Sequence, residues 1–153
     1  METKNTARVE AQMLIRKPAG LVFQAFIDPE LTKNFWFTKG SGKLESGKSI
    51  TWEWEMYGVS STVFVREIVA DKKISVDWDQ YSTVVDFEFE DMGDETTYVK
   101  ITQYGFRTTG DELLAEVSGA SGGFTTVVDG LKAYLEHGIN LNLIADKFPK
   151  GVK

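Results

Sequence analysis

The sequence contains no cysteine and a single histidine, His137. The lack of thiols excludes disulfides, thiolate zinc sites and a cysteine nucleophile. One histidine cannot build a histidine cluster for a metal ion, and it leaves a His-activated nucleophile without spare partners. Because His137 stands beside Gly138 at the end of a helical pattern, we expect it to stabilise that helix end from the surface. The sequence therefore predicts no metal site and no cofactor.

Basic residues are fewer than acidic ones: Lys and Arg total 17, Asp and Glu total 23, and the formal net charge is −6. A protein that neutralises phosphates or docks on anionic lipid needs a basic face, so the charge argues against nucleic-acid and membrane partners. Long apolar runs are also missing and residues 1–12 are polar, so we expect neither a transmembrane helix nor a secretory signal. Together with the missing cysteine, these features predict a cytoplasmic protein.

The remaining composition is typical of one folded domain over residues 1–153. Hydrophobic residues make up 42% of the chain and aromatic residues 12%, which is enough to build a core and unlike a disordered segment. Because the chain contains no repeat and no low-complexity linker, we expect a single core.

Alternation of apolar and polar residues marks the predicted strands. Residues 7–15 place Val9, Ala11, Met13 and Ile15 on one face. Further alternating blocks occupy residues 50–57, 61–69, 73–78, 83–90 and 96–104. They are separated by the short segments Tyr57-Gly58, Ala70-Asp71-Lys72, Asp79-Gln80 and Gly93-Asp94. Such short connections predict antiparallel hairpins.

Two short helices are predicted between the first strand and the second. Pro18 opens the first helix, whose apolar stripe comprises Leu21, Val22, Ala25 and Phe26. Asp28-Pro29 ends that helix, and Asp28 is placed to cap a second one that ends near Trp36.

The C-terminal third has helical spacing. We expect a short helix over residues 111–117, ended by the glycine-rich segment SGASGG at 118–123. A longer helix then follows, with an apolar face made by Phe124, Val127, Val128, Leu131, Tyr134 and Leu135. Gly138 is its expected C-terminal stop. A sheet with one apolar face must be covered, and this helix is the obvious cover, with either a core or a cavity between them.

The orientation of residues 61–69 stays open at this point. Val63, Val65 and Val69 compete with Phe64 and Ile68 for the inner face. Both faces of this block carry apolar residues, so alternation alone does not choose between them.

Four stretches together resemble a known family. They are IRKPAGLVFQAFIDPELTKNFWF from residue 15, VREIVADKKISVDW from 65, DETTYVKITQYGF from 94 and GGFTTVVDGLKAYLEHG from 122. Their order is similar to that of stand-alone domains of the activator of heat-shock protein 90 ATPase homologue type. These domains belong to the START-like, birch-pollen-allergen-like helix-grip superfamily. Ala70-Asp71 replaces the usual proline of the second stretch, and Phe124 stands where tryptophan is common.

The resemblance implies an α+β helix-grip fold. In this fold a curved antiparallel sheet of about six to seven strands wraps around a long C-terminal helix, and two short helices follow the first strand. It implies several functions, because the fold hosts cyclases, lipid binders and co-chaperone domains. The chaperone activators carry an additional N-terminal domain, and we expect 153 residues to accommodate only the C-terminal type.

A phosphate-loop pattern is present at Gly42, Gly47, Lys48 and Ser49. A nucleotide-binding loop must lead into a helix, whose N-terminus then faces the phosphates. The alternating block at residues 50–57 predicts a strand instead. We therefore interpret the pattern as a hairpin turn that feeds a strand.

The candidate site combines aromatic residues with the inward faces of strands and helix. Its predicted ligand-binding residues are Trp36, Trp52, Trp54, Glu67, Trp78, Phe87, Phe89, Gln103, Phe124, Val128 and Leu131. The aromatic residues either fill a core or line a pocket. Glu67 and Gln103 are polar residues on apolar strand faces, so they either orient a ligand or reach solvent at strand ends. Glu53, Glu55, Glu88 and Glu90 fit the solvated outer face of the sheet.

Three functions remain as hypotheses. The first is a non-catalytic protein that holds a small hydrophobic or aromatic molecule between the sheet and the C-terminal helix, as a monomer or a homodimer. The second is a co-chaperone-like module that acts on an Hsp90-type ATPase. The third is a cyclase-like or hydrolase-like enzyme of the same fold, for which the sequence shows no nucleophile and base pair.

Overall fold

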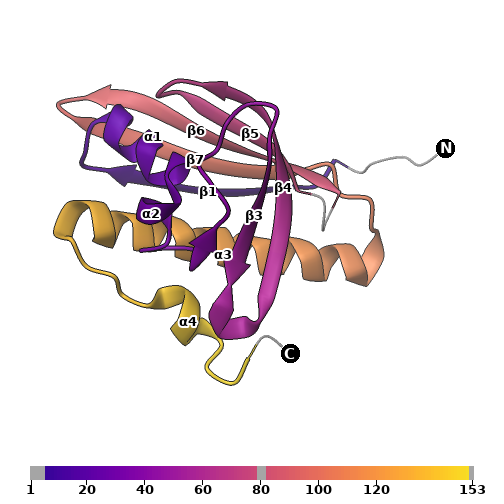
Figure 1. Cartoon of the computed structure of the whole chain (residues 1–153). Helices are drawn as coiled ribbons and strands as arrows, with labels where there is room; N and C mark the ends of the chain where they lie inside the picture. The colour runs from indigo at the N-terminus through magenta and orange to yellow at the C-terminus, as the bar shows by residue number, and fades with distance from the viewer. Residues whose placement is uncertain (1–5, 79–81, 152–153) are drawn as a thin grey trace.

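Seven antiparallel strands form one curved sheet in the computed structural model, which describes residues 6–78 and 82–151 (Figure 1). The strands are β1 (Arg8–Ile15), β2 (Lys39–Gly40), β3 (Ser49–Trp54), β4 (Val59–Val69), β5 (Lys73–Trp78), β6 (Thr83–Gly93) and β7 (Thr96–Tyr104). Their order is β1-β7-β6-β5-β4-β3-β2, so consecutive strands from β2 to β7 are neighbours. The predicted hairpin topology is confirmed, and the predicted break at Asp79-Gln80 lies outside the described residues.

The helices cover one face of this sheet (Figure 1). They are α1 (Ala19–Ile27), α2 (Pro29–Thr32), α3 (Gly110–His137) and α4 (Leu143–Lys147), with a 3₁₀ turn at Glu55–Tyr57. Asp28 caps α2 as predicted, since its side chain accepts a hydrogen bond of 3.0 Å from the Glu30 N–H. The architecture is the α+β helix-grip arrangement that the sequence predicts. None of the described helices is long and apolar enough to cross a membrane.

The predicted helix break at residues 118–123 is wrong, because α3 runs without interruption from Gly110 to His137. None of the three glycines in this segment has a positive φ, so the backbone continues in the helical region. A glycine costs a helix about 1 kcal/mol relative to alanine. Burial of Phe124, Val127 and Leu131 further along the same helix outweighs that cost.

The predicted end of α3 is confirmed. Gly138 adopts a left-handed φ of 67°, and its N–H donates to the carbonyl of Tyr134 over 2.9 Å. Glycine reaches this conformation without a steric penalty, which is why the helix ends there. The side chain of His137, the last helical residue, is 67% exposed.

A β-bulge in β4 decides the orientation that alternation left open. Val63 and Val65 point into the core, and the pairing with β5 then shifts between Val65 and Glu67. The extra residue reverses the alternation, so Ile68 packs against the core while Val69 is 39% exposed. The inner face is thus the one that carries Val63 and Val65 up to the bulge, and Val69 does not share it.

The strand predicted over residues 50–57 is shorter than expected. β3 ends at Trp54, and Met56 lies in the 3₁₀ turn that follows, where it is 40% exposed. In α1, Leu21 is 44% exposed, so the buried stripe is formed by Val22, Ala25 and Phe26 with their neighbours.

The buried residues of α3 all lie in its second half, from Phe124 onward. This half packs on the sheet beside α1 and α2, where Phe26 and Phe35 contact edge to face with centroids 5.4 Å apart. The first half of α3 buries no residue in this way. The core therefore fills the end of the space that lies under the second half of α3.

Candidate ligand-binding site

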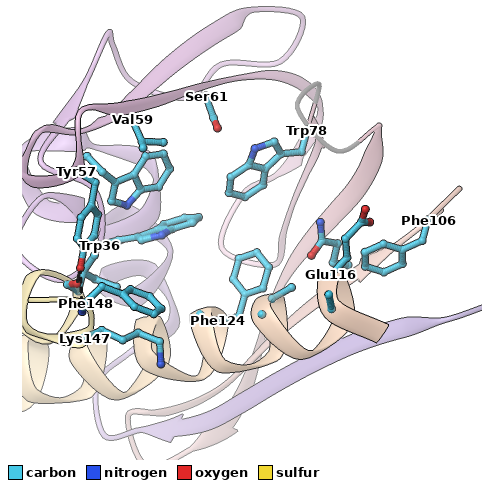
Figure 2. Close-up of a pocket in the computed structure, with 17 residues that line it drawn as sticks. Trp36, Tyr57, Val59, Ser61, Trp78, Phe106, Glu116, Phe124, Lys147 and Phe148 are labelled. Atoms are coloured by element: carbon cyan, nitrogen blue, oxygen red, sulfur yellow. Dashed lines mark hydrogen bonds between the residues drawn. The ribbon is translucent and has the colours of Figure 1, made fainter. Parts of the chain in front are cut away.

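A cavity of about 530 Å³ lies between the sheet and the first half of α3. Figure 2 shows its walls: the strands lie opposite α3, and the α4 segment lies at one end. This volume falls within the range of about 300–1,000 Å³ that is typical of small-molecule sites.

One face of α3 forms the floor of the cavity. Its contributors are Ala115, Glu116, Gly119, Ala120, Gly123 and Phe124. Residues spaced three and four apart lie on one side of a helix, so the small residues of this set follow one another along the cavity. A Cβ atom added at Gly119 or Gly123 would meet no atom within 4 Å. A side chain at either position would therefore enter open space.

Tryptophans form the opposite wall. Trp36 follows α2 and lies with its ring centroid 6.0 Å from Trp78 and 6.0 Å from Phe124. Trp54, at the end of β3, stacks on Trp78 with 6.5 Å between centroids and 13° between planes. Contacts between aromatic rings thus connect the loop after α2, the strands β3 and β5, and helix α3 along this wall.

The α4 segment closes one end of the cavity. Ile144, Lys147 and Phe148 line it together with Tyr57 from the turn between β3 and β4. The Tyr57 hydroxyl donates to the backbone carbonyl of Ile144 and accepts a hydrogen bond from the Phe148 N–H over 3.3 Å. The ammonium of Lys147 lies 5.8 Å from the ring centroid of Phe148. Lys147 and Phe148 are both exposed, so this end lies at the protein surface.

Gln103 is a buried polar side chain in the cavity wall, with an exposed fraction of only 3%. Its Nε2 donates a hydrogen bond of 2.8 Å to Oγ1 of Thr83. Its Oε1 accepts no hydrogen bond from the part of the chain that the structure describes. Within residues 6–78 and 82–151, no group of three or more His, Cys, Asp or Glu residues could hold a metal ion.

The structure places five predicted site residues in the cavity wall: Trp36, Trp54, Trp78, Gln103 and Phe124. Five others lie in the core instead, namely Trp52, Phe87, Phe89, Val128 and Leu131. Trp52 stacks on Phe37 with centroids 5.2 Å apart, and Phe89 contacts Phe23 edge to face at 5.7 Å. Some of the predicted aromatic residues therefore line the cavity, and others pack in the core at a different part of the inner face.

Glu67 lies away from the cavity. The bulge before it turns its side chain outward, where it is 55% exposed and its carboxylate lies 3.7 Å from the Lys73 ammonium. Of the two alternatives for these polar strand residues, exposure to solvent holds for Glu67. Gln103 does not reach solvent, because it is buried in the cavity wall.

The segment with the phosphate-loop pattern connects β2 to β3. Lys48 forms an ion pair of 3.1 Å with Glu45, and its carbonyl accepts a hydrogen bond from the Val65 N–H. The predicted strand after the pattern is confirmed, because β3 begins at Ser49. The segment therefore offers no helix N-terminus to a phosphate.

Several cavity residues were missed by the sequence prediction. They are Tyr57, Val59, Ser61, Phe106, Ala115, Glu116, Gly119, Ala120, Gly123, Ile144, Lys147 and Phe148. The spacing of Glu116, Gly119, Ala120 and Gly123 predicts a helix face of small residues only if the segment SGASGG is helical. The α4 residues carry no comparable signal, because five helical residues show too little periodicity.

Comparison with known proteins agrees with this architecture. A family model described as "Activator of Hsp90 ATPase homolog 1-like protein" matches residues 16–136. The chain belongs to this family. Among curated proteins none matches the chain at a significant level.

Solved structures of family members and related proteins share the fold. The protein SSP2350 from Staphylococcus saprophyticus is 27% identical, with a TM-score of 0.77 over 88% of this chain and 96% of that one. The Aha1 dimer from Colwellia psychrerythraea is 18% identical, with a TM-score of 0.74 over 86% of this chain and 98% of that one. DynU16, from the dynemicin biosynthetic locus, is 19% identical, with a TM-score of 0.76 over 87% of this chain and 48% of that one. The last two likenesses concern the fold alone.

Proposed function

We propose that this domain is a non-catalytic binding protein that holds a small hydrophobic or aromatic molecule in the cavity between the sheet and α3. The observation that carries the proposal is the cavity of about 530 Å³ with aromatic walls. Apolar walls with few polar groups are typical of sites that bury most of a small ligand. Membership of a helix-grip family supports the same proposal, since ligand binding is common among proteins of this fold.

The direct test is a panel of neutral aromatic probes, beginning with N-phenyl-1-naphthylamine. We expect saturable quenching of tryptophan fluorescence, because Trp36, Trp54 and Trp78 line the cavity. We also expect a rise in melting temperature, because a ligand that binds only the folded state stabilises it. A flat fluorescence and melting response across the panel would contradict the proposal.

A matched pair of variants on α3 localises the binding. Gly123→Leu places a side chain in the cavity, where a Cβ meets nothing within 4 Å. Thr125→Leu adds the same side chain at an exposed position that does not line the cavity. We expect Gly123→Leu to weaken probe binding about 10-fold or more, equivalent to about 1.4 kcal/mol, and Thr125→Leu to leave it unchanged. Equal binding by both variants would place the probe elsewhere.

A co-chaperone-like role is the second candidate, and the family description is the observation that favours it. An ATPase assay on a cognate Hsp90-type chaperone, with this protein in excess, tests it. Stimulation that persists in Gly123→Leu would separate this role from ligand binding, whereas no stimulation would exclude activation of that chaperone. For either role we propose a cytoplasmic protein, as a monomer or a homodimer; the Colwellia relative was solved as a dimer.

A further inference from the structure

The carbonyl oxygen of Gln103 is a buried hydrogen-bond acceptor beside the cavity. Gln103 is 3% exposed and lines the cavity from the end of β7. Its Oε1 receives no hydrogen bond from the residues that the structure describes. Buried polar atoms in folded proteins nearly always have a partner, because burial removes them from water at a free-energy cost. An acceptor of this kind in a cavity wall indicates that its partner comes from outside the chain.

The bond to Thr83 fixes the orientation of the Gln103 amide. Nε2 donates to Thr83 Oγ1 over 2.8 Å, and Thr83 is itself 2% exposed. Thr83 begins β6 and pairs with Trp78 of β5, so the amide is held by the sheet. With the nitrogen held by this bond, the oxygen is the atom that stays available.

A second acceptor lies on the α3 side of the same cavity. Glu116 contributes to the cavity floor, and the oxygens of its carboxyl group accept hydrogen bonds. Figure 2 shows the Glu116 side chain rising from α3, away from the labelled tryptophans. The polar groups that Gln103 and Glu116 offer are therefore matched by a ligand that donates.

We propose that the cavity selects ligands with an apolar aromatic body and a hydroxyl group, and that this hydroxyl donates a hydrogen bond to Gln103 Oε1. The proposal rests on the function proposed above and names the chemical class of its ligand: phenols and aromatic alcohols. The aromatic body contacts Trp36, Trp78 and Phe124, while the hydroxyl supplies the missing donor.

Three probes with one ring system test this selection: 2-naphthol, 2-methoxynaphthalene and 2-methylnaphthalene. The first donates a hydrogen bond, the second only accepts one and the third does neither. In wild type we expect 2-naphthol to bind about 5-fold to 10-fold more tightly than the other two, as measured by calorimetric titration. In Gln103→Leu, which removes the acceptor and keeps an apolar side chain of similar size, we expect the three affinities to become equal.

Gln103→Glu is the matched variant, because it keeps acceptor oxygens at the same place and should retain the preference for 2-naphthol. If Gln103→Leu fails to fold, the wild-type comparison and Gln103→Glu decide the matter. Equal affinities of all three probes in wild type would overturn the selection by Gln103 and leave hydrophobic binding standing. Preference for 2-methoxynaphthalene would also overturn it, since the amide would then be donating. If none of the three probes binds wild type while N-phenyl-1-naphthylamine does, this inference falls and the proposed function stands. If N-phenyl-1-naphthylamine and the rest of the panel also fail to bind, the proposed function falls as well.

Discussion

The hydroxyl of Tyr57 donates a hydrogen bond to the backbone carbonyl of Ile144, which lies 87 residues later in the chain. The same hydroxyl accepts from the Phe148 N–H over 3.3 Å. One phenol thus attaches the C-terminal segment to the turn between β3 and β4. This attachment positions Ile144 and Phe148 at the end of the cavity.

Tyr57→Phe should loosen α4 without disturbing the sheet. We expect a loss of about 1 kcal/mol in the free energy of unfolding, together with faster amide hydrogen exchange in residues 143–148. Tyr98→Phe is the control, because no hydrogen bond of the Tyr98 hydroxyl is found among the described residues. Unchanged exchange in α4 of Tyr57→Phe would show that packing alone holds the segment.

Two glycines of α3 should respond oppositely to added side chains. Gly119→Ala should raise the free energy of unfolding by about 0.5–1 kcal/mol, because its Cβ meets open space and alanine favours the helix. Gly130→Val should lower it by about 1–3 kcal/mol, because a Cβ at Gly130 already lies 3.3 Å from the Phe35 carbonyl oxygen. Urea denaturation of both variants provides the measurement. A gain in stability from Gly130→Val would show that Phe35 can move aside.

Glu136 should make stability dependent on pH in the acid range. Its side chain is 9% exposed, and its Oε2 accepts from the Lys132 ammonium over 2.7 Å and from the Arg16 N–H over 2.8 Å. Burial raises the pKa of Glu136, but these hydrogen bonds and the charge of Lys132 outweigh burial and hold the pKa below 4.5. Because the unfolded state then binds the proton more tightly, Glu136 stabilises the fold above pH 4.5, and this stability is lost as the pH falls through the lower folded-state pKa.

Glu136→Gln is the variant that measures this contribution. We expect it to cost about 1–3 kcal/mol at pH 7. The difference from wild type should shrink as the pH is lowered from 5 through 3, because wild-type Glu136 becomes protonated as well. A difference that stays constant with pH would mean that packing, and not charge, accounts for the loss.

Glu67→Ala should change little. Its exposed ion pair with Lys73 is worth about 0–1 kcal/mol, and its side chain lies outside the cavity. We expect unchanged probe affinity beside a melting temperature close to that of wild type. Weakened binding in this variant would mean that the ligand contacts the outer end of β4.

Most of the fold could be predicted because its local signals agree with its tertiary structure. Short turns between alternating blocks specify adjacent antiparallel strands, and the apolar stripe from Phe124 to Leu135 specifies the covering helix. The errors occurred where tertiary packing outweighs a local preference. SGASGG is a poor helix segment by composition, yet it is helical because the rest of α3 packs against the sheet.

The candidate site was only partly predictable. Alternation of apolar and polar residues identifies which face of the sheet a side chain is on, but it does not tell whether that side chain packs in the core or borders the cavity. Phe87 and Trp78 share the inner face of the sheet, yet Phe87 packs 5.3 Å from Phe26 while Trp78 borders the cavity. Glu67 was misplaced because a single bulge residue reverses every side chain after it, and alternation carries no sign of the bulge.

The small residues on α3 give the cavity a further property. Because Gly119, Ala120 and Gly123 lie in its floor, the depth of the cavity depends on which residues occupy these three positions of one regular helix. Changes at these positions would alter the accepted ligand size while the strands, their register and the tryptophan wall stay the same. Under the binding function proposed above, ligand size can therefore change without a change in the sheet, and this helix face is the place to engineer it.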